Sequence, residues 1–275
     1  MSHTSRRIGI LLAGLAALAT FLVLAVAPRS TAAPSHHGGP KPTIVLVHGA
    51  WADSSSWAGV ARRLQDRGYT VDVPPNPLRS LQSDADSLRA YLGTISGPVV
   101  LVGHSYGGAV ITNAATGNAG VKALVYINAF APDEGESVVQ LATERPGSAI
   151  GGDPAQVFDV VPYPGGDVDL YIKRAVFPHA FANDLPPRTA AVLAATQRPV
   201  TGSAVGASSG PPAWKTIPSW YLVGTADNVI PPAEQRFMAR RANARTVEVR
   251  ASHLSMISRP RAVTKLIVDA AQSGH

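Results

Sequence analysis

Short apolar runs alternate with amphipathic segments along most of the chain. Near-continuous apolar runs of about four to eight residues are typical of parallel β-strands buried on both faces of a sheet. We therefore predict six strands, "TIVLVHG" (43–49), "YTVDVP" (69–74), "GPVVLVGH" (97–104), "VKALVYINAF" (121–130), "SWYLVGT" (219–225) and "RTVEVRA" (245–251).

Amphipathic segments lie between these runs, and polar residues, glycine or proline mark their ends. Such boundaries are typical of helices. Five core helices are predicted, at 55–68, 83–95, 106–117, 231–244 and 258–272. Strand–helix alternation favours right-handed βαβ units, so the fold class is α/β with a doubly wound, mainly parallel six-stranded sheet.

The alternation stops between Ala131 and Pro212, where proline, glycine and aspartate are frequent. Short helical patches are predicted there, in "DLYIKRAVF" (169–177) and "PPRTAAVLAATQ" (186–197). Because this block follows the fourth strand, we predict a cap inserted over the carboxyl ends of the strands. In open α/β sheets that edge is where ligands bind.

The first residues are typical of an export signal. Arg6 and Arg7 precede an uncharged, almost wholly apolar run from Ile8 to Ala27, and small residues follow. A basic, apolar and then small-residue pattern predicts a cleaved leader. The run is also long enough to remain as a membrane anchor, and "SRRIGI" partly matches a twin-arginine signal, so both alternatives stay open.

These patterns divide the chain into a leader, a linker and a core interrupted by the cap. The predicted boundaries are 1–32 for the signal peptide, 33–42 for the linker, 43–130 and 213–275 for the two parts of the core, and 131–212 for the cap.

Charge and composition exclude several classes of function. The formal charge is +6, but the predicted leader holds three arginines and no acid, so the remainder carries +3. Basic runs with interleaved aromatic residues are missing, which argues against nucleic-acid binding. The chain contains no cysteine, which excludes cysteine nucleophiles and thiolate metal sites. We expect no metal or organic cofactor, no membrane contact of the mature chain, and a monomer or homodimer.

The segment "GHSYG" follows the third predicted strand and precedes a helix. It matches the pattern G-x-S-x-G, in which a sharp turn exposes a nucleophilic serine at the sheet edge. The serine is Ser105. Gly103 and Gly107 give the strand and helix room to approach, and the side chain of His104 is expected to point away from the site.

A serine hydroxyl needs a base to take its proton, and the base needs an acid to orient it. In folds of this class the acid and then the histidine follow the serine along the chain. Asp227 comes just after the fifth strand and His253 just after the sixth. Both would lie at the same sheet edge as Ser105. Asp133, after the fourth strand, is the alternative acid.

Acyl transfer also needs donors for the charge that develops on the carbonyl oxygen. One N–H should come from the residue after the nucleophile, Tyr106. The other should come from the loop after the first strand, "HGAW", where Ala50 is the first candidate and Trp51 the second. His48 in the same segment is expected to brace the loop.

At "HGAW", "GHSYGG", "GTAD" and "SHLSMISRP" together, the chain resembles the α/β-hydrolase superfamily, from Thr43 to the C-terminus. It is most similar to the small serine esterase branch that includes plant methyl-salicylate esterases and hydroxynitrile lyases. The lyases carry a threonine and a lysine where this chain has Gly49 and Leu254. The resemblance therefore implies the esterase activity.

The sequence predicts an exported serine hydrolase that cleaves a small, uncharged and fairly apolar carboxylic ester through an acyl-enzyme. A slow ligand-binding protein of the same fold and a cofactor-free perhydrolase are the alternatives, and lactones and amides stay open as substrates. The aromatic residues that could line either the cap core or the pocket are Phe130, Phe158, Tyr163, Tyr171, Phe177 and Phe181.

Overall fold

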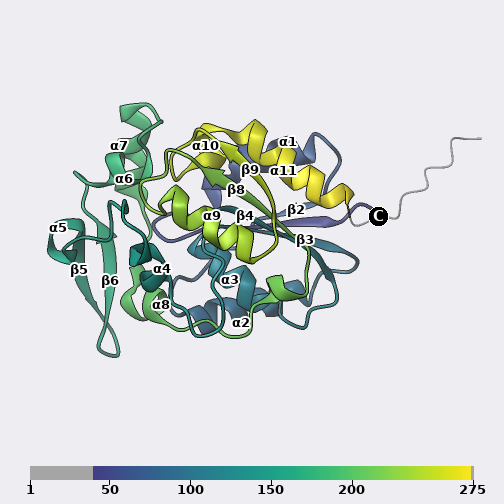
Figure 1. The fold of residues 1–275 in the computed structure, drawn as a ribbon, viewed down its shortest axis with the longest axis horizontal. Coiled ribbons are helices and arrows are strands. Elements are labelled where there is room, and N and C mark those ends of the chain that lie inside the picture. Colours follow the sequence, from purple (N-terminus) through teal and green to yellow (C-terminus); the bar gives the residue numbers. More distant parts are fainter. Residues whose placement is uncertain (1–39, 274–275) are drawn as a thin grey trace, which may run out of the picture. The chain divides into compact units, whose positions relative to one another are not determined.

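A six-stranded parallel sheet forms the centre of the molecule (Figure 1). The computed structural model describes residues 40–273, so the predicted leader and most of the predicted linker lie outside the described residues. The strand order is β2-β1-β3-β4-β8-β9. The strands are β1 (Thr43–Val47), β2 (Val71–Asp72), β3 (Val99–Ser105), β4 (Val121–Ala129), β8 (Ser219–Gly224) and β9 (Arg245–Val249).

This sheet confirms the predicted fold class, with each predicted strand present. The reason is visible in the burial of the strands: every residue of β1 after Thr43, and all of β3 and β8, are buried. Strands covered on both faces need apolar side chains at successive positions, and that continuous pattern is easy to find in a sequence.

Helices cover both faces of the sheet (Figure 1). On one face lie α1 (Ala58–Gln65), α10 (Ser255–Ser258) and α11 (Pro260–Gln272). On the other lie α2 (Leu81–Leu92), α3 (Tyr106–Ala114) and α9 (Pro232–Arg241). Two short 3-10 helices, η1 (Ser54–Trp57) and η2 (Ala213–Lys215), complete the core. Among these, α10 was not predicted because it is only one turn long.

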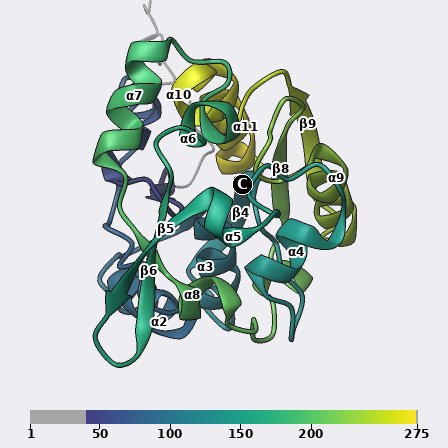
Figure 2. The same cartoon turned by 90° about the vertical axis from the view of Figure 1, so that its left-hand side faces the viewer.

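The inserted segment between β4 and β8 builds its own small sheet, of order β5-β6-β7 (Figure 2). Its strands are antiparallel. The elements in chain order are α4 (Val138–Glu144), α5 (Pro154–Val157), β5 (Phe158–Tyr163), β6 (Asp167–Ile172), α6 (Phe177–Phe181), α7 (Pro187–Thr196), β7 (Val200–Thr201) and α8 (Gly202–Gly206).

One prediction for the insertion is wrong. Residues 169–172 begin no helical patch; they belong to strand β6 and pair with β5. The cause is the turn at Gly165 and Gly166, both of which have positive φ values, 86° and 85°. Consecutive residues of this kind favour a hairpin between the flanking segments. The predicted helix at 186–197 is present as α7.

No helix within residues 40–273 has the length and hydropathy needed to cross a membrane. The hydrophobic core is one continuous cluster of buried side chains around the sheet, and it includes Trp57, Tyr126 and Tyr221. The two tyrosine rings stack with centroids 5.8 Å apart, between β4 and β8. The pairing of these central strands is therefore reinforced by side chains as well as by backbone hydrogen bonds.

Helix α3 approaches β4 closely at Gly108. A methyl group on Gly108 would lie 2.3 Å from the carbonyl oxygen of Phe130 and 2.8 Å from the Cβ atom of Ala129. We predict that Gly108→Ala lowers the free energy of unfolding by about 2 kcal/mol, because backbone must move to relieve the overlap. Urea unfolding followed by circular dichroism measures this change.

Gly206, at the end of α8, supplies the matched control, since an added methyl group there meets nothing within 4 Å. Gly206→Ala should leave stability unchanged or slightly raised, because alanine restricts the unfolded chain. Equal stabilities of the two variants would show that the α3–β4 contact tolerates a larger residue.

Candidate active site

Ser105 lies on a sharp turn between β3 and α3. Its backbone is in a left-handed conformation, with φ 52° and ψ −125°. Non-glycine residues adopt such angles rarely, and strain of this kind is concentrated at functional sites. Methyl groups on Gly103 and Gly107 would each come within 2.6 Å of a backbone oxygen. The two glycines predicted to flank the nucleophile thus do permit the close strand–helix approach.

Asp227 and His253 meet beside this turn. Asp227 follows β8, His253 follows β9, and the Nδ1 atom of His253 is 2.9 Å from the Oδ2 atom of Asp227. Both side chains are buried. A carboxylate can only accept, so Nδ1 carries the hydrogen and Nε2 is left as the basic nitrogen.

The Nε2 atom of His253 has no hydrogen-bond partner within residues 40–273. The structure therefore joins the predicted acid and base, while the hydroxyl of Ser105 makes no hydrogen bond to the imidazole. In unliganded enzymes this contact is often long and tightens when substrate binds. A buried basic nitrogen without a partner is what a proton acceptor for the serine requires.

The ring of His253 lies close to the wall of the pocket that holds Ser105. The ring of Phe181 lies edge-on to the rings of His253 and Trp51, with centroids 5.0 Å and 5.5 Å away. Trp51 and Ser105 line the same pocket. One aromatic side chain of the cap thus packs against both the imidazole and a residue of the pocket.

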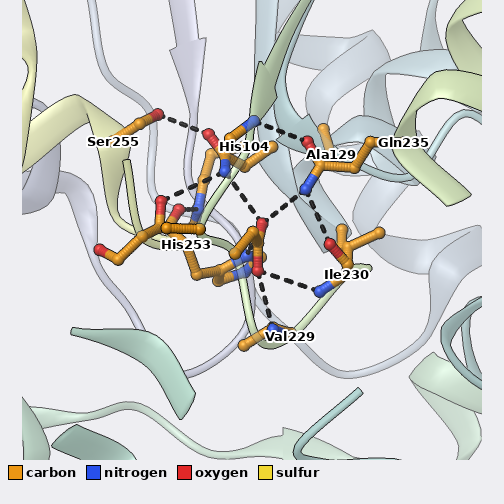
Figure 3. A network of polar contacts seen from close by, with 12 residues as sticks. His104, Ala129, Val229, Ile230, Gln235, His253 and Ser255 are labelled. Carbon is orange, nitrogen blue, oxygen red and sulfur yellow. Dashed lines mark hydrogen bonds and ion pairs between the residues drawn. The ribbon is translucent and has the colours of Figure 1, made fainter. Parts of the chain in front are cut away.

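A dense set of N–H donors holds the carboxylate of Asp227 (Figure 3). Its Oδ1 atom accepts from the amides of Val229 and Ile230, at 2.8 and 3.0 Å. Its Oδ2 atom accepts from Asn128 and Gln235 as well as from His253, at 2.9, 2.8 and 2.9 Å. These donors compensate the cost of burying a charge and fix the direction of the bond to the imidazole.

The hydrogen bonds of Asn128 and Gln235 to Asp227 were not foreseen from the sequence. Asn128 is the penultimate residue of β4 and has a positive φ of 45°. Its Nδ2 atom also donates to the carbonyl of Ser252 at 3.2 Å, and its Oδ1 atom accepts from Ser255 at 2.6 Å. It therefore ties the acid to the loop that carries His253. An asparagine at the end of the apolar run "VYINAF" is the one signal that was present.

The buried ring of His104 packs behind His253, with centroids 4.7 Å apart. Its Nε2 atom donates to the backbone carbonyl of His253 at 2.9 Å. Burial, with a smaller effect of the neighbouring His253, holds the pKa of His104 well below its usual range. His104 is therefore neutral and supports the backbone of the base.

His48 braces the loop that follows β1. Its Nε2 atom accepts a hydrogen bond from the backbone N–H of Asn76 at 3.0 Å, and Asn76 donates from its side chain to the carbonyl of His48 at 3.0 Å. Burial lowers the pKa of His48 to about 4. The acceptor role of Nε2 requires this neutral form.

The two backbone amides predicted to bind an oxyanion border the same pocket as Ser105. Ala50, Trp51 and Tyr106 all line it. Within residues 40–273 the amides of Ala50 and Tyr106 donate no hydrogen bond to another group. Trp51 has a positive φ of 56°, which turns the backbone sharply beyond Ala50. The described geometry thus leaves both donors free to bind a ligand.

The pocket has a volume of about 360 Å³ and lies between the core and the cap. None of the described residues that line it has a charged side chain. Its apolar wall comes largely from the cap and includes Phe130, Val138, Val139, Ala142, Ile150, Phe158, Leu170 and Val205.

The other aromatic candidates lie elsewhere. Phe177 and Phe181 stack on each other in the cap core, with centroids 4.9 Å apart. Tyr163 is at the exposed tip of the β5–β6 hairpin.

The alternative acid lies away from the imidazole. Asp133 forms an ion pair with Lys215 at 2.5 Å on the protein surface. Metal ligation is not evident either: within residues 40–273 no three histidine or carboxylate side chains gather in a suitable cluster.

Comparisons with known proteins agree on one family. The sequence profile described as "Alpha/beta hydrolase family" matches residues 44–266. A carbendazim hydrolyzing esterase of Nocardioides sp. is 34% identical over 110 residues, which are 35% of this chain and 46% of that enzyme. The putative methylesterase 19 of Arabidopsis thaliana is 25% identical over 272 residues, covering 84% of this chain and 98% of that protein.

The crystal structure of a pyrethroid hydrolase from Sphingobium faniae has the same fold. It superposes with a TM-score of 0.68 at 23% identity, over 84% of this chain and 98% of that one.

The neutral state of His48 predicts a pH dependence of stability. Its pKa falls from its ordinary value of 6.5 in the unfolded chain to about 4 in the folded protein. The unfolded chain therefore binds the proton first as pH drops below 6.5. This residue should remove about 3 kcal/mol of stability between pH 6.5 and 4.

The His48→Gln variant, whose amide oxygen can replace Nε2 as acceptor, should lose less stability over this range in urea titrations. The control is His179→Gln in the exposed part of the cap, which should keep the slope of the parent protein. Parallel stability curves for His48→Gln and the parent protein would contradict this prediction.

Proposed function

Because the chain belongs to the alpha/beta hydrolase family, we propose that it cleaves carboxylic esters with Ser105 as the nucleophile. One observation carries the proposal: a buried imidazole, oriented by Asp227, has a free basic nitrogen and packs against His104, the residue next to the strained serine. A serine, a base and an orienting acid form the constellation that activates a hydroxyl group for acyl transfer.

In the proposed reaction the Nε2 atom of His253 takes the proton of Ser105 as the Oγ atom attacks the ester carbonyl. The negative charge that develops on the carbonyl oxygen is bound by the N–H groups of Ala50 and Tyr106. Asp227 stabilises the imidazolium ion. The alcohol then leaves with the proton from Nε2, and water attacks the acyl-enzyme by the same route.

The lining of the pocket supports a neutral, apolar ester as substrate. A carboxylate or ammonium group in this pocket would lose its hydration without gaining a partner. The similar proteins include a carbendazim hydrolyzing esterase and a pyrethroid hydrolase. Pocket size limits the enclosed part of the substrate to a small or medium-sized group.

We further propose that the mature chain acts outside the cytoplasm. Support comes from the sequence alone: the basic pair Arg6 and Arg7, the apolar run from Ile8 to Ala27, and the small residues after it. Mass spectrometry of the N-terminus of secreted protein tests this proposal, since a cleaved leader would leave a chain beginning near residue 33.

Ser105→Ala should abolish both turnover and covalent labelling. We expect the parent protein to hydrolyse p-nitrophenyl butyrate and to react with a fluorophosphonate probe. In the variant kcat should fall by at least about 1,000-fold, because the acyl-enzyme cannot form. Absorbance at 400 nm follows turnover, and intact-mass spectrometry detects the adduct. Retained labelling of the variant would refute Ser105 as the nucleophile.

A charge on the acyl group of the substrate should lower kcat/KM. p-Nitrophenyl butyrate and the mono-p-nitrophenyl ester of succinate have acyl chains of similar length but differ in a terminal carboxylate. We predict that kcat/KM for the succinate ester is lower by at least about 100-fold, because an unpaired carboxylate is costly to bury. Similar values for the two esters would show that the acyl group does not enter the apolar pocket.

A further inference from the structure

Cap strand β6 is hydrogen bonded to the loop that supplies one of the proposed oxyanion donors. The indole Nε1 atom of Trp51 donates to the backbone carbonyl of Leu170 at 2.8 Å. Trp51 directly follows Ala50 and has a left-handed φ of 56°. Such a conformation persists only where surrounding contacts hold it. The bond to β6 is one such contact, and the stacking of Trp51 on Phe158, with centroids 5.8 Å apart, is another.

The neighbouring residue of the same strand connects to the second donor. The carboxylate of Asp169 pairs with the guanidinium of Arg79 at 2.7 Å. The backbone N–H of Arg79 donates to the Oδ1 atom of Asp84 at 3.1 Å. The Oδ2 atom of Asp84 accepts from the hydroxyl of Tyr106 at 2.8 Å, and Tyr106 supplies the other N–H.

This second connection is largely enclosed. Asp84 is 1% exposed and Tyr106 is also 1% exposed. The cap holds Arg79 from further sides, because its guanidinium also donates to the carbonyl of Pro199 at 3.3 Å and its own carbonyl accepts from Thr201 at 2.6 Å. A displacement of the cap sheet would therefore move Arg79, and Arg79 would in turn move Asp84 through their hydrogen bond.

We propose that β6 positions both donors of the oxyanion hole, Ala50 through Trp51 and Tyr106 through Arg79 and Asp84. The inference rests on the proposed function, since it assumes that these two amides bind the oxyanion. Trp51 and Asp169 are positioning residues in this arrangement. Leu170 also lines the substrate pocket. Contact between substrate and β6 is thereby linked to the placement of the groups that stabilise the transition state.

Two variants interrupt the two connections separately. Trp51→Phe removes the indole N–H and keeps an aromatic ring against Phe158. Asp169→Asn removes the charge that holds Arg79, at a position that does not line the pocket.

Each variant has a matched control in the chain. Trp214→Phe removes an indole N–H that donates to Pro132 at 2.9 Å away from the site, in a side chain of similar exposure. Asp159→Asn breaks an ion pair with Lys173 at 2.7 Å in the same cap sheet.

The test compares two inhibitors. Serine adds to the carbonyl of a trifluoromethyl ketone and forms an oxyanion, whereas the corresponding unfluorinated methyl ketone binds without that charge. For Trp51→Phe and Asp169→Asn we expect kcat on p-nitrophenyl butyrate to fall by about 5- to 20-fold, less than the loss of a whole donor. Affinity for the trifluoromethyl ketone should fall by the same factor. For Asp169→Asn, KM and affinity for the methyl ketone should change by less than about twofold, since ground-state binding is retained. Trp51 itself lines the pocket, so for Trp51→Phe the ratio of the two ketone affinities is the readout, and it should fall by the same factor as kcat.

The controls Trp214→Phe and Asp159→Asn should keep the values of the parent protein. The inference is overturned if either Trp51→Phe or Asp169→Asn keeps the kcat of its control, or if its loss is confined to KM. An inactive parent protein, or labelling that persists in Ser105→Ala, would instead refute the proposed function. Thermal unfolding of all four variants identifies any that fail to fold, and the ratio of the two ketone affinities in the remaining variant then decides.

Discussion

The buried carboxylate of Asp227 is the group on which the architecture of the site depends. Charge in a protein interior is tolerated only where hydrogen bonds replace the lost water. Here five N–H groups supply them, from the end of β4, from α9, and from the loops after β8 and β9. One ion thus joins segments distant in sequence and sets the direction of the imidazole. The acid of the proposed reaction is thus also the residue that holds these segments together.

Burial also shifts the pKa values of other titratable groups in the core. Burial lowers the pKa values of His48 and His104, and burial raises the pKa of Asp84. Opposite shifts have the same origin, because desolvation disfavours whichever form is charged. Of these groups, His104 packs directly against His253, and its neutral form adds no positive charge beside that imidazole.

Different parts of this structure were predictable from the sequence to different degrees. Strands β1, β3, β4 and β8 of the central sheet were found because burial on both faces requires continuous apolar runs. The sharp turn at Ser105 was predictable because it needs glycine at fixed positions. Asn128 was missed, since its role depends on a left-handed backbone and on partners that only the fold brings near. In the cap, apolar spacing favoured a helix at 169–177, whereas the Gly165–Gly166 turn, visible in the sequence, directs a hairpin.

The bond between Trp51 and strand β6 has a consequence for how the pocket can diverge. Its acceptor is the main-chain oxygen of Leu170, which any amino acid able to remain in the strand would provide. Exchange of the Leu170 side chain can thus alter substrate preference while the tie to the loop of Ala50 survives. Substitutions of the pocket-lining side chains at Leu170 and at Val138, Val139 and Ala142 of α4 are therefore suited to directed evolution of new substrate specificities. Asp169 cannot be exchanged in the same way, because its own side chain forms the ion pair with Arg79.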